Sequence, residues 1–210
     1  MGGIEVDTGL ETCVKGLYAA GEAVGGANGA NRLSGNAIPE AMVFGERAGR
    51  LAAGKVAGNG TRADRTDFAA AIERIRSVGS GTPADAPRAA HLRRKLQALM
   101  WENVGAFRDE AGLDAAIAEI RRMRDEDLPA IHVPAHLVYN TERVEWFELR
   151  GGLDTAEAIA VAARERRESR GAHQRTDYPE TRVDAAQSQK IARDADRLVS
   201  TFTDVQKVAA

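Results

Sequence analysis

From residue 37 onward, hydrophobic side chains recur every three or four positions along most of the chain. This spacing gathers them on one face of a helix and predicts helices over 37–56, 66–78, 88–107, 113–124, 138–149, 153–167 and 185–202. Asn36 is a suitable cap for the first of these, and Pro39 falls in its first turn, where proline is tolerated. The glycines at 151 and 152 separate two of the predicted helices.

The first 21 residues follow a different pattern. Short β-prone pieces at 4–6, 12–14 and 17–19 alternate with Gly and Asp, and a loop of mostly small residues follows at 23–30. The expected fold class is therefore α+β, with a short β-rich end followed by a mostly helical domain that forms a bundle.

Composition excludes several classes of function. The formal net charge is −2, so no basic field is present to hold nucleic acid. Cys13 is the only cysteine, which excludes an internal disulfide and a cysteine-cluster metal site and fits a reducing compartment. No apolar run approaches the roughly 20 residues that span a bilayer. The first residues do not read as a secretory signal, so we expect a cytoplasmic location.

Glycine is concentrated in the first 60 residues, where it suggests close approach of the backbone to a ligand. The stretches 58–63 and 79–84 both match G-x-G-x-x-A, but each follows a predicted helix rather than a strand. We interpret them as helix ends and loops, not as dinucleotide sites.

The segment 16–45 is a better candidate for a ligand-binding site than the two G-x-G-x-x-A stretches. A β-prone piece runs into Gly21-Glu22, where backbone can approach a ligand and a carboxylate can accept hydrogen bonds from hydroxyl groups. Arg32 supplies one cation among small residues. The stretch 34–36 then leads into a helix, whose free N–H groups and positive dipole end attract an anion. The pattern indicates a polar, hydroxylated and anionic ligand.

The residues at this point resemble a known family. Residues 1–7, 16–22 and 29–36 read M-G-G-I-E-V-D, G-L-Y-A-A-G-E and G-A-N-R-L-S-G-N, and residues 168–179 read E-S-R-G-A-H-Q-R-T-D-Y-P. Stretches of this kind, in this order, resemble the flavin-binding end and helical C-terminal domain of the succinate dehydrogenase/fumarate reductase flavoprotein family, which includes L-aspartate oxidase. The resemblance covers about residues 1–179.

The resemblance implies a division of the chain. Residues 1–60 would be the C-terminal piece of an FAD-binding domain, 61–87 a helix and linker, and 88–180 the family's helical C-terminal domain. Residues 181–210 would be a tail with a possible helix.

The resemblance also implies roles for particular residues. FAD is the implied cofactor, with Glu22 at its ribose and phosphate region and Arg32 holding a carboxylate of a small dicarboxylate substrate. The cofactor-binding residues expected from the motifs are Gly21, Glu22, Asn31, Ser34, Gly35, Asn36, Ala37 and Ile38. The helix that begins there would stabilise negative charge on the reduced flavin ring.

The implied function is hydride transfer between flavin and a small dicarboxylate. The family's nucleotide-binding strand, its G-x-G-x-x-G motif and its proton-donating Arg are absent from these residues, so we expect a portion of a longer flavoprotein that is inactive without its N-terminal half. An iron–sulfur subunit is an implied partner, with a peripheral position on the inner face of a membrane and no membrane span. Two alternatives stay open: a non-catalytic helical module for subunit docking, and an L-aspartate oxidase-like enzyme fragment.

Several other polar residues are interpreted as structural. Arg170 and His173 would anchor a loop without periodicity. His132 and His136 lack the third ligand that a zinc site needs, so a solvated helix start is expected there. The mixed charges at 164–168 predict a solvated helix face. No metal-binding residue is predicted.

Overall fold

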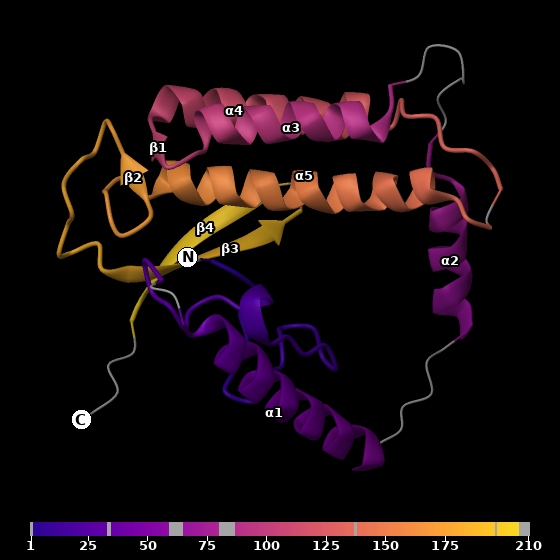
Figure 1. Cartoon of the computed structure of the whole chain (residues 1–210), viewed down its shortest axis with the longest axis horizontal. Coiled ribbons are helices and arrows are strands. Elements are labelled where there is room, and N and C mark those ends of the chain that lie inside the picture. Colours follow the sequence, from indigo (N-terminus) through magenta and orange to yellow (C-terminus); the bar gives the residue numbers. More distant parts are fainter. Residues whose placement is uncertain are drawn as a thin grey trace. The chain divides into compact units, whose positions relative to one another are not determined.

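The computed structural model describes residues 2–32, 35–58, 65–79, 87–136, 138–195 and 197–205. The chain divides into two compact units, 1–64 and 65–210 (Figure 1). Helices dominate and only two small sheets are present in the described part of the chain, which confirms the predicted α+β class. No helix in these ranges is long and apolar enough to cross a membrane.

The first unit consists of turns around one long helix. The β-prone pieces form isolated bridges, Ile4 with Val24 and Glu11 with Tyr18, rather than strands. A short 3₁₀ helix, η1 (Gly21–Ala23), packs against α1 (Ala37–Gly58). Helix α1 confirms the first predicted helix. Among its described side chains, the small Ala48 is the one that is buried against the rest of the unit.

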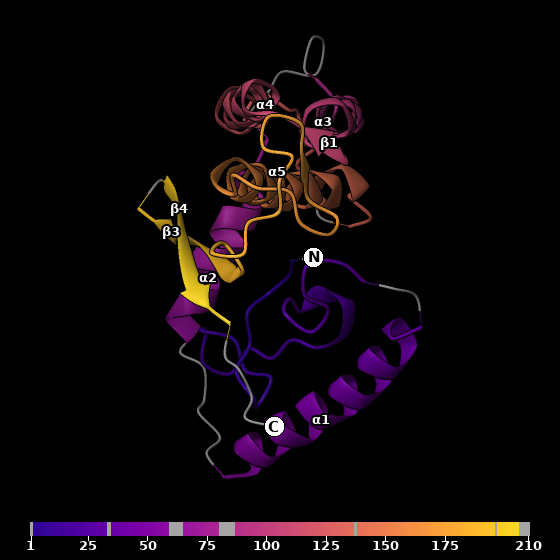
Figure 2. The same ribbon diagram turned by 90° about the vertical axis from the view of Figure 1, so that its left-hand side faces the viewer.

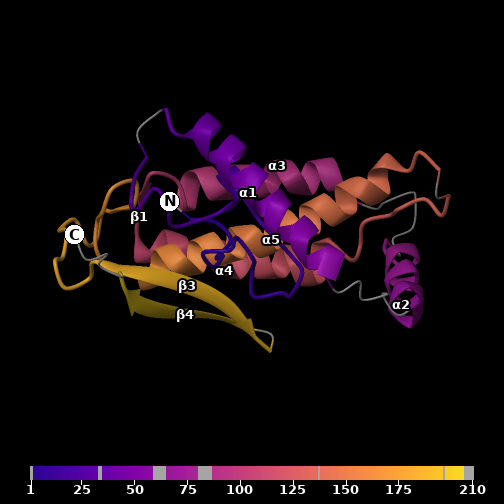
Figure 3. The same ribbon diagram turned by 90° about the horizontal axis from the view of Figure 1, so that it is seen from below.

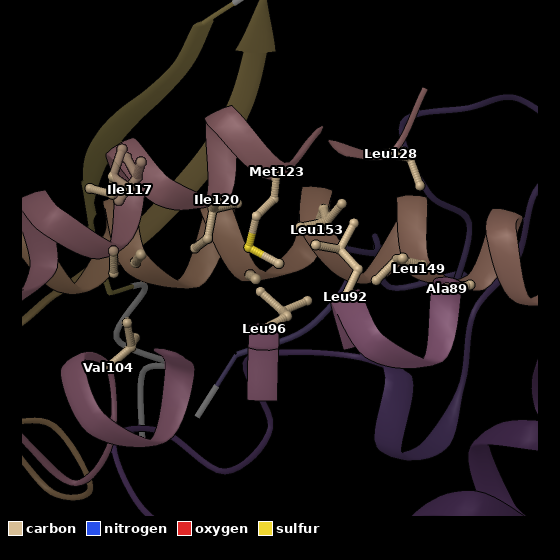
Figure 4. Packing of buried hydrophobic residues seen from close by; sticks show 14 of the residues in the cluster. Ala89, Leu92, Leu96, Val104, Ile117, Ile120, Met123, Leu128, Leu149 and Leu153 are labelled. Carbon is tan, nitrogen blue, oxygen red and sulfur yellow. The ribbon is translucent and has the colours of Figure 1, made fainter. Parts of the chain in front are cut away.

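Three helices form the core of the second unit: α3 (Ala89–Asn103), α4 (Glu110–Arg122) and α5 (Thr141–Glu165). They pack against one another in pairs, as the end-on view in Figure 2 shows. Their buried faces meet in one cluster that includes Leu92, Ile120 and Leu153 (Figure 4). The predicted apolar stripes of these helices therefore form the core of the bundle.

Side-chain caps explain where α4 and α5 begin. The Asp109 side chain accepts a hydrogen bond from the Gly112 amide at 2.8 Å, and the Asn140 side chain accepts one from the Arg143 amide at 3.0 Å. The Asn140 amide group also donates to the carbonyls of Pro134 and His136, both at 2.7 Å. Residues 132–136 are therefore a loop ahead of α5, and the expected helix start there was wrong.

The remaining elements of this unit are short. Helix α2 (Arg65–Arg76) precedes the bundle, and the π-helical turn η2 (Met123–Asp127) continues α4. Strands β1 (Phe107–Arg108) and β2 (Gln174–Arg175) pair in parallel and bring residues 168–179 to the corner between α3 and α4.

Helix α5 is continuous through Gly151 and Gly152, whereas the sequence predicted two helices around them. Glycine costs about 1 kcal/mol relative to alanine inside a helix. Leu149 and Leu153 on either side are 2% and 0% exposed, so packing against α3 and α4 outweighs this cost. Tertiary burial therefore joins the two predicted helices into one.

The helix predicted over 185–202 was wrong. Residues Gln187–Asp194 form β3 and Arg197–Asp204 form β4, an antiparallel hairpin that packs on α5 (Figure 3). Alternate residues of the hairpin are partly buried, but three of these inward positions are polar: Gln187, Gln189 and Ser200. Gln189 donates to the Ala162 carbonyl at 3.0 Å and to the Ser200 hydroxyl at 2.8 Å. Polar residues at inward positions hide the alternation that would have predicted strands.

We predict that Leu153→Ala lowers the free energy of unfolding by about 2–5 kcal/mol, because it empties a fully buried site in the bundle. Ile159→Ala, at a 47% exposed position of the same helix, should change it by about 0.5–1 kcal/mol. Urea unfolding followed by circular dichroism checks both. Equal destabilisation by the two substitutions would contradict the assigned core.

Candidate functional site

The first motif stretch lies side by side with residues 23–25, which directly follow the second motif stretch in the first unit. The Ile4 amide donates to the Ala23 carbonyl at 2.8 Å, and the Gly25 amide donates to the Ile4 carbonyl at 3.1 Å. Gly3 and Gly25 face each other so closely that a Cβ built on Gly25 would lie 2.7 Å from the Gly3 nitrogen. Only glycine leaves room for this backbone contact.

Gly21 fixes the turn that carries Glu22. Its φ of +71° lies in the left-handed region, and a Cβ there would lie 3.3 Å from the Ala41 Cα of α1. The Glu22 side chain is exposed, and in the described part of the chain no group donates a hydrogen bond to its carboxylate. The carboxylate is therefore available to accept hydrogen bonds from a hydroxylated ligand.

The third motif stretch leads into α1. The Asn36 carbonyl accepts the Glu40 amide at 2.9 Å, which starts the helix, and Gly35 before it has a φ of +116°. Ala37 and Ile38 occupy the exposed first turn, where backbone N–H groups have no partner within the helix. Ser34 lies outside the described residues.

Arg32 and Asn31 lie just before that turn. The Asn31 side-chain oxygen accepts the Arg32 amide at 2.9 Å, which fixes the local backbone. The Arg32 side chain is half-buried, and its guanidinium has no hydrogen bond or ion pair to any described residue. A guanidinium without such partners can bind a carboxylate through two parallel hydrogen bonds.

A small hollow of about 190 Å³ lies next to Gly21 and the first half of α1, and among the predicted cofactor residues only Gly21 lines it. Its lining includes Gly21, Val24, Glu40 and Phe44, and Glu40 accepts a hydrogen bond from the Asn28 side chain at 3.3 Å. Pockets that enclose a cofactor-sized ligand usually measure about 300–1,000 Å³. The hollow is therefore large enough for only part of such a ligand.

The C-terminal end of α1 is held by an ion pair that the sequence did not predict. Lys55 donates to a Glu11 carboxylate oxygen at 2.5 Å and lies 5.7 Å from the centre of the Tyr18 ring. The Gly16 amide donates to the other Glu11 oxygen at 2.9 Å. The Gly16 amide, followed by Lys55, lowers the pKa of Glu11. Its partners are 5 and 44 positions away, so no local motif signals the pair.

The fourth motif stretch, residues 168–179 in the second unit, contains two buried charged residues. Glu168 is 1% exposed and accepts from the Arg166 and Arg170 side chains at 2.8 and 3.0 Å. Glu168 is therefore buried, and the solvated face predicted for 164–168 was wrong at this residue. Arg175, also 1% exposed, donates to Asp177 at 2.7 and 2.8 Å. These bonds from Arg175 hold the pKa of Asp177 at about 2.

His173 belongs to the same structural network. Its Nε2 lies 3.0 Å from the Arg166 carbonyl oxygen, and its backbone exchanges two hydrogen bonds with Arg170. Burial lowers the pKa of His173, and the nearby Arg108, Arg166 and Arg175 act in the same direction. These contacts agree with a structural role for Arg170 and His173. The described residues contain no group of three His, Cys, Asp or Glu that could hold a metal.

Two family models match the chain. Residues 93–208 match the model described as fumarate reductase flavoprotein C-term, and residues 1–38 match an FAD binding domain. The first match spans more than half of the chain, so the chain belongs to the fumarate reductase flavoprotein C-terminal family. FAD is the cofactor that these matches imply.

Curated relatives agree with this assignment. The fumarate reductase flavoprotein subunit of Mycobacterium tuberculosis is 40% identical over 190 residues, which covers 85% of this chain and 32% of that protein. L-aspartate oxidase of Synechocystis is 31% identical over 196 residues, covering 87% of this chain and 34% of that protein. The chain therefore spans about a third of the length of these relatives.

A solved structure is similar across nearly the whole chain. A variant of Escherichia coli quinol fumarate reductase FrdA superposes with a TM-score of 0.88 at 30% identity, covering 99% of this chain and 37% of that one. Several of the relatives are named as flavoprotein subunits, a name given to chains of multi-subunit enzymes.

We predict that Gly25→Ala loosens the contact between the first motif stretch and residues 23–25, because the new methyl group would press on the Gly3 backbone. The expected cost is about 1–3 kcal/mol. Hydrogen exchange at the Ile4 and Gly25 amides should accelerate. Gly2→Ala is the control, since nothing lies within 4 Å of a Cβ there. Unchanged exchange in the Gly25 variant would contradict the assigned contact.

We predict that His173 makes stability depend on pH. Its folded pKa lies below the ordinary 6.5, so its contribution is present above pH 6.5 and is lost as pH falls through the folded pKa. His173→Gln should reduce this slope. Urea unfolding from pH 8 to pH 5, in about half-unit steps, gives the slope. A His173 ring that titrates at or above 6.5 by NMR would refute the prediction.

Proposed function

We propose that this chain is the C-terminal portion of an FAD-dependent oxidoreductase that transfers hydride between flavin and a small dicarboxylate. The proposal rests on one observation above all: close glycine contacts join the stretches 2–4 and 21–25 and place Gly21 against Ala41 in the first turns of α1. Family matches at 1–38 and 93–208 support it. On this proposal the protein is peripheral to a membrane, on its cytoplasmic face.

The residues present suit FAD. Backbone at Gly21 approaches α1 without a side chain between them, and Glu22 offers a carboxylate for ribose hydroxyl groups. The exposed N–H groups at Ala37 and Ile38, with the positive end of the α1 dipole, suit negative charge. Bound FAD would supply the hydride chemistry. Gly35 and Asn36 would shape the turn that faces it.

Arg32 is assigned to the substrate. Its guanidinium stays charged at any working pH and matches a carboxylate with two parallel donors. Its role is to orient the dicarboxylate and balance its charge, so that the reacting carbon is held near the flavin. Asn31 positions Arg32 through the bond to its backbone amide.

The remainder of the FAD-binding domain is the first partner we propose. Large apolar side chains of α1 stay exposed, with Ile38 at 72%, Met42 at 69%, Val43 at 60% and Val56 at 70%. Exposed apolar surface of this extent on one helix is typical of an interface. The small volume of the hollow and the greater length of the relatives also support a further protein segment that covers α1. An iron–sulfur subunit is a further proposed partner, since the relatives are named as subunits.

The test uses a chimera in which this chain replaces the matching C-terminal third of the M. tuberculosis subunit. We predict that Arg32→Ala lowers kcat/KM for fumarate, with a reduced dye as electron donor, by about 100-fold, since a charge-assisted bidentate contact is lost. Arg32→Lys should retain part of the activity. FAD content should not change in either variant.

Arg50→Ala is the matched control, because Arg50 is an exposed arginine of α1 that pairs with Glu46. A chimera that folds without FAD would refute the cofactor assignment. A chimera that holds FAD and reduces fumarate equally well after Arg32→Ala would refute the role of Arg32 alone. Oxidation of L-aspartate in place of fumarate reduction would favour the second candidate, to which the similarity with L-aspartate oxidase points.

A further inference from the structure

The second unit contains a hollow that shares no residue with the candidate flavin site. It has a volume of about 400 Å³ and lies between η2, the middle of α5 and strand β3. This volume falls within the roughly 300–1,000 Å³ typical of small-molecule pockets.

The inner wall of the hollow is apolar. Leu128 is 3% exposed and Trp146 is 8% exposed, and both line it. The Trp146 Nε1–H donates to the Leu128 carbonyl at 2.9 Å, so the polar group of the indole is already satisfied. Phe147 contacts the indole edge to face, with 5.1 Å between the ring centres. The small exposed part of the indole is therefore a fixed, largely apolar part of the wall.

The charged groups around the hollow are paired with one exception. Arg193 donates to Asp154 at 3.1 Å, and Arg124 pairs with Asp125 at 2.9 Å and with the buried Glu157. Arg121 also pairs with Glu157, at 2.7 Å.

Arg150 is the exception. Its guanidinium has no hydrogen bond or ion pair to any residue in the described ranges. Three arginines and two aspartates line the hollow, so its lining carries one positive charge in excess.

We propose that this hollow binds a small aromatic carboxylate. The carboxylate accepts hydrogen bonds from Arg150, and the aromatic body lies against Trp146 and Leu128. An apolar wall with one unpaired guanidinium favours a monoanion with a flat apolar body over inorganic phosphate, which would leave the wall uncovered. The inference does not depend on the proposed flavin function.

The test uses the full 210-residue chain with Trp101→Phe, so that Trp146 is the only tryptophan and gives a single indole N–H signal by NMR. The probe is 2-naphthoate, and its neutral analogue 2-naphthalenemethanol is the comparison. We expect a saturable shift of the indole signal with 2-naphthoate. Arg150→Gln should weaken binding at least about tenfold, the loss expected for a hydrogen bond to a charged group.

Arg94→Gln is the matched control, since Arg94 is an exposed arginine of α3 that does not line the hollow. It should leave the affinity for 2-naphthoate unchanged. The neutral alcohol should bind at least about tenfold more weakly than the carboxylate. The proposal is overturned by the absence of a saturable shift, by equal binding of acid and alcohol, or by equal loss in the Arg150 and Arg94 variants.

Discussion

At Gly3 and Gly25 two stretches of backbone lie so close that neither residue has room for a methyl group. This contact, with the approach of Gly21 to Ala41, fixes the turn that carries Glu22 against the start of α1. The position of Glu22 depends on these contacts, because Glu22 lies in the short turn between Gly21 and the bridge of Val24 with Ile4. Glycine is needed here because it lets the two backbones approach each other closely, and not because it makes the chain flexible.

The two units bury their apolar residues to very different extents. The helical unit encloses a core in which Leu113, Ile120 and Leu153 are fully buried. Among the described hydrophobic residues of the first unit, only Leu10 and Ala48 are buried, and most large apolar side chains of α1 stay exposed. A unit of this kind gains little from hydrophobic burial by itself. The imbalance is the physical reason for assigning the uncovered face of α1 to the rest of an FAD-binding domain.

The sequence predicted the helices of the core and the turn at Gly21-Glu22, because both rest on local signals. Apolar spacing places Leu92 and Leu153 on buried faces, and Gly21-Glu22 follows directly on a β-prone piece. The features that the sequence did not predict depend on contacts between residues far apart in the chain. Gln189 faces inward because its bonds reach Ala162 and Ser200, and Glu168 is buried because three arginines surround it in the fold. The roles of Glu22, Arg32 and the α1 start stay predictions, since no ligand fixes them.

The central claim is that residues 2–58 form the last part of a flavin site that another polypeptide segment completes. The visible absorption spectrum after gel filtration, with FAD added beforehand, tests it most directly. We predict that the chimera with the M. tuberculosis subunit retains one FAD per chain and that the 210-residue chain alone retains none. A folded chimera that elutes without flavin absorption would contradict the account, and so would stoichiometric FAD on the chain alone.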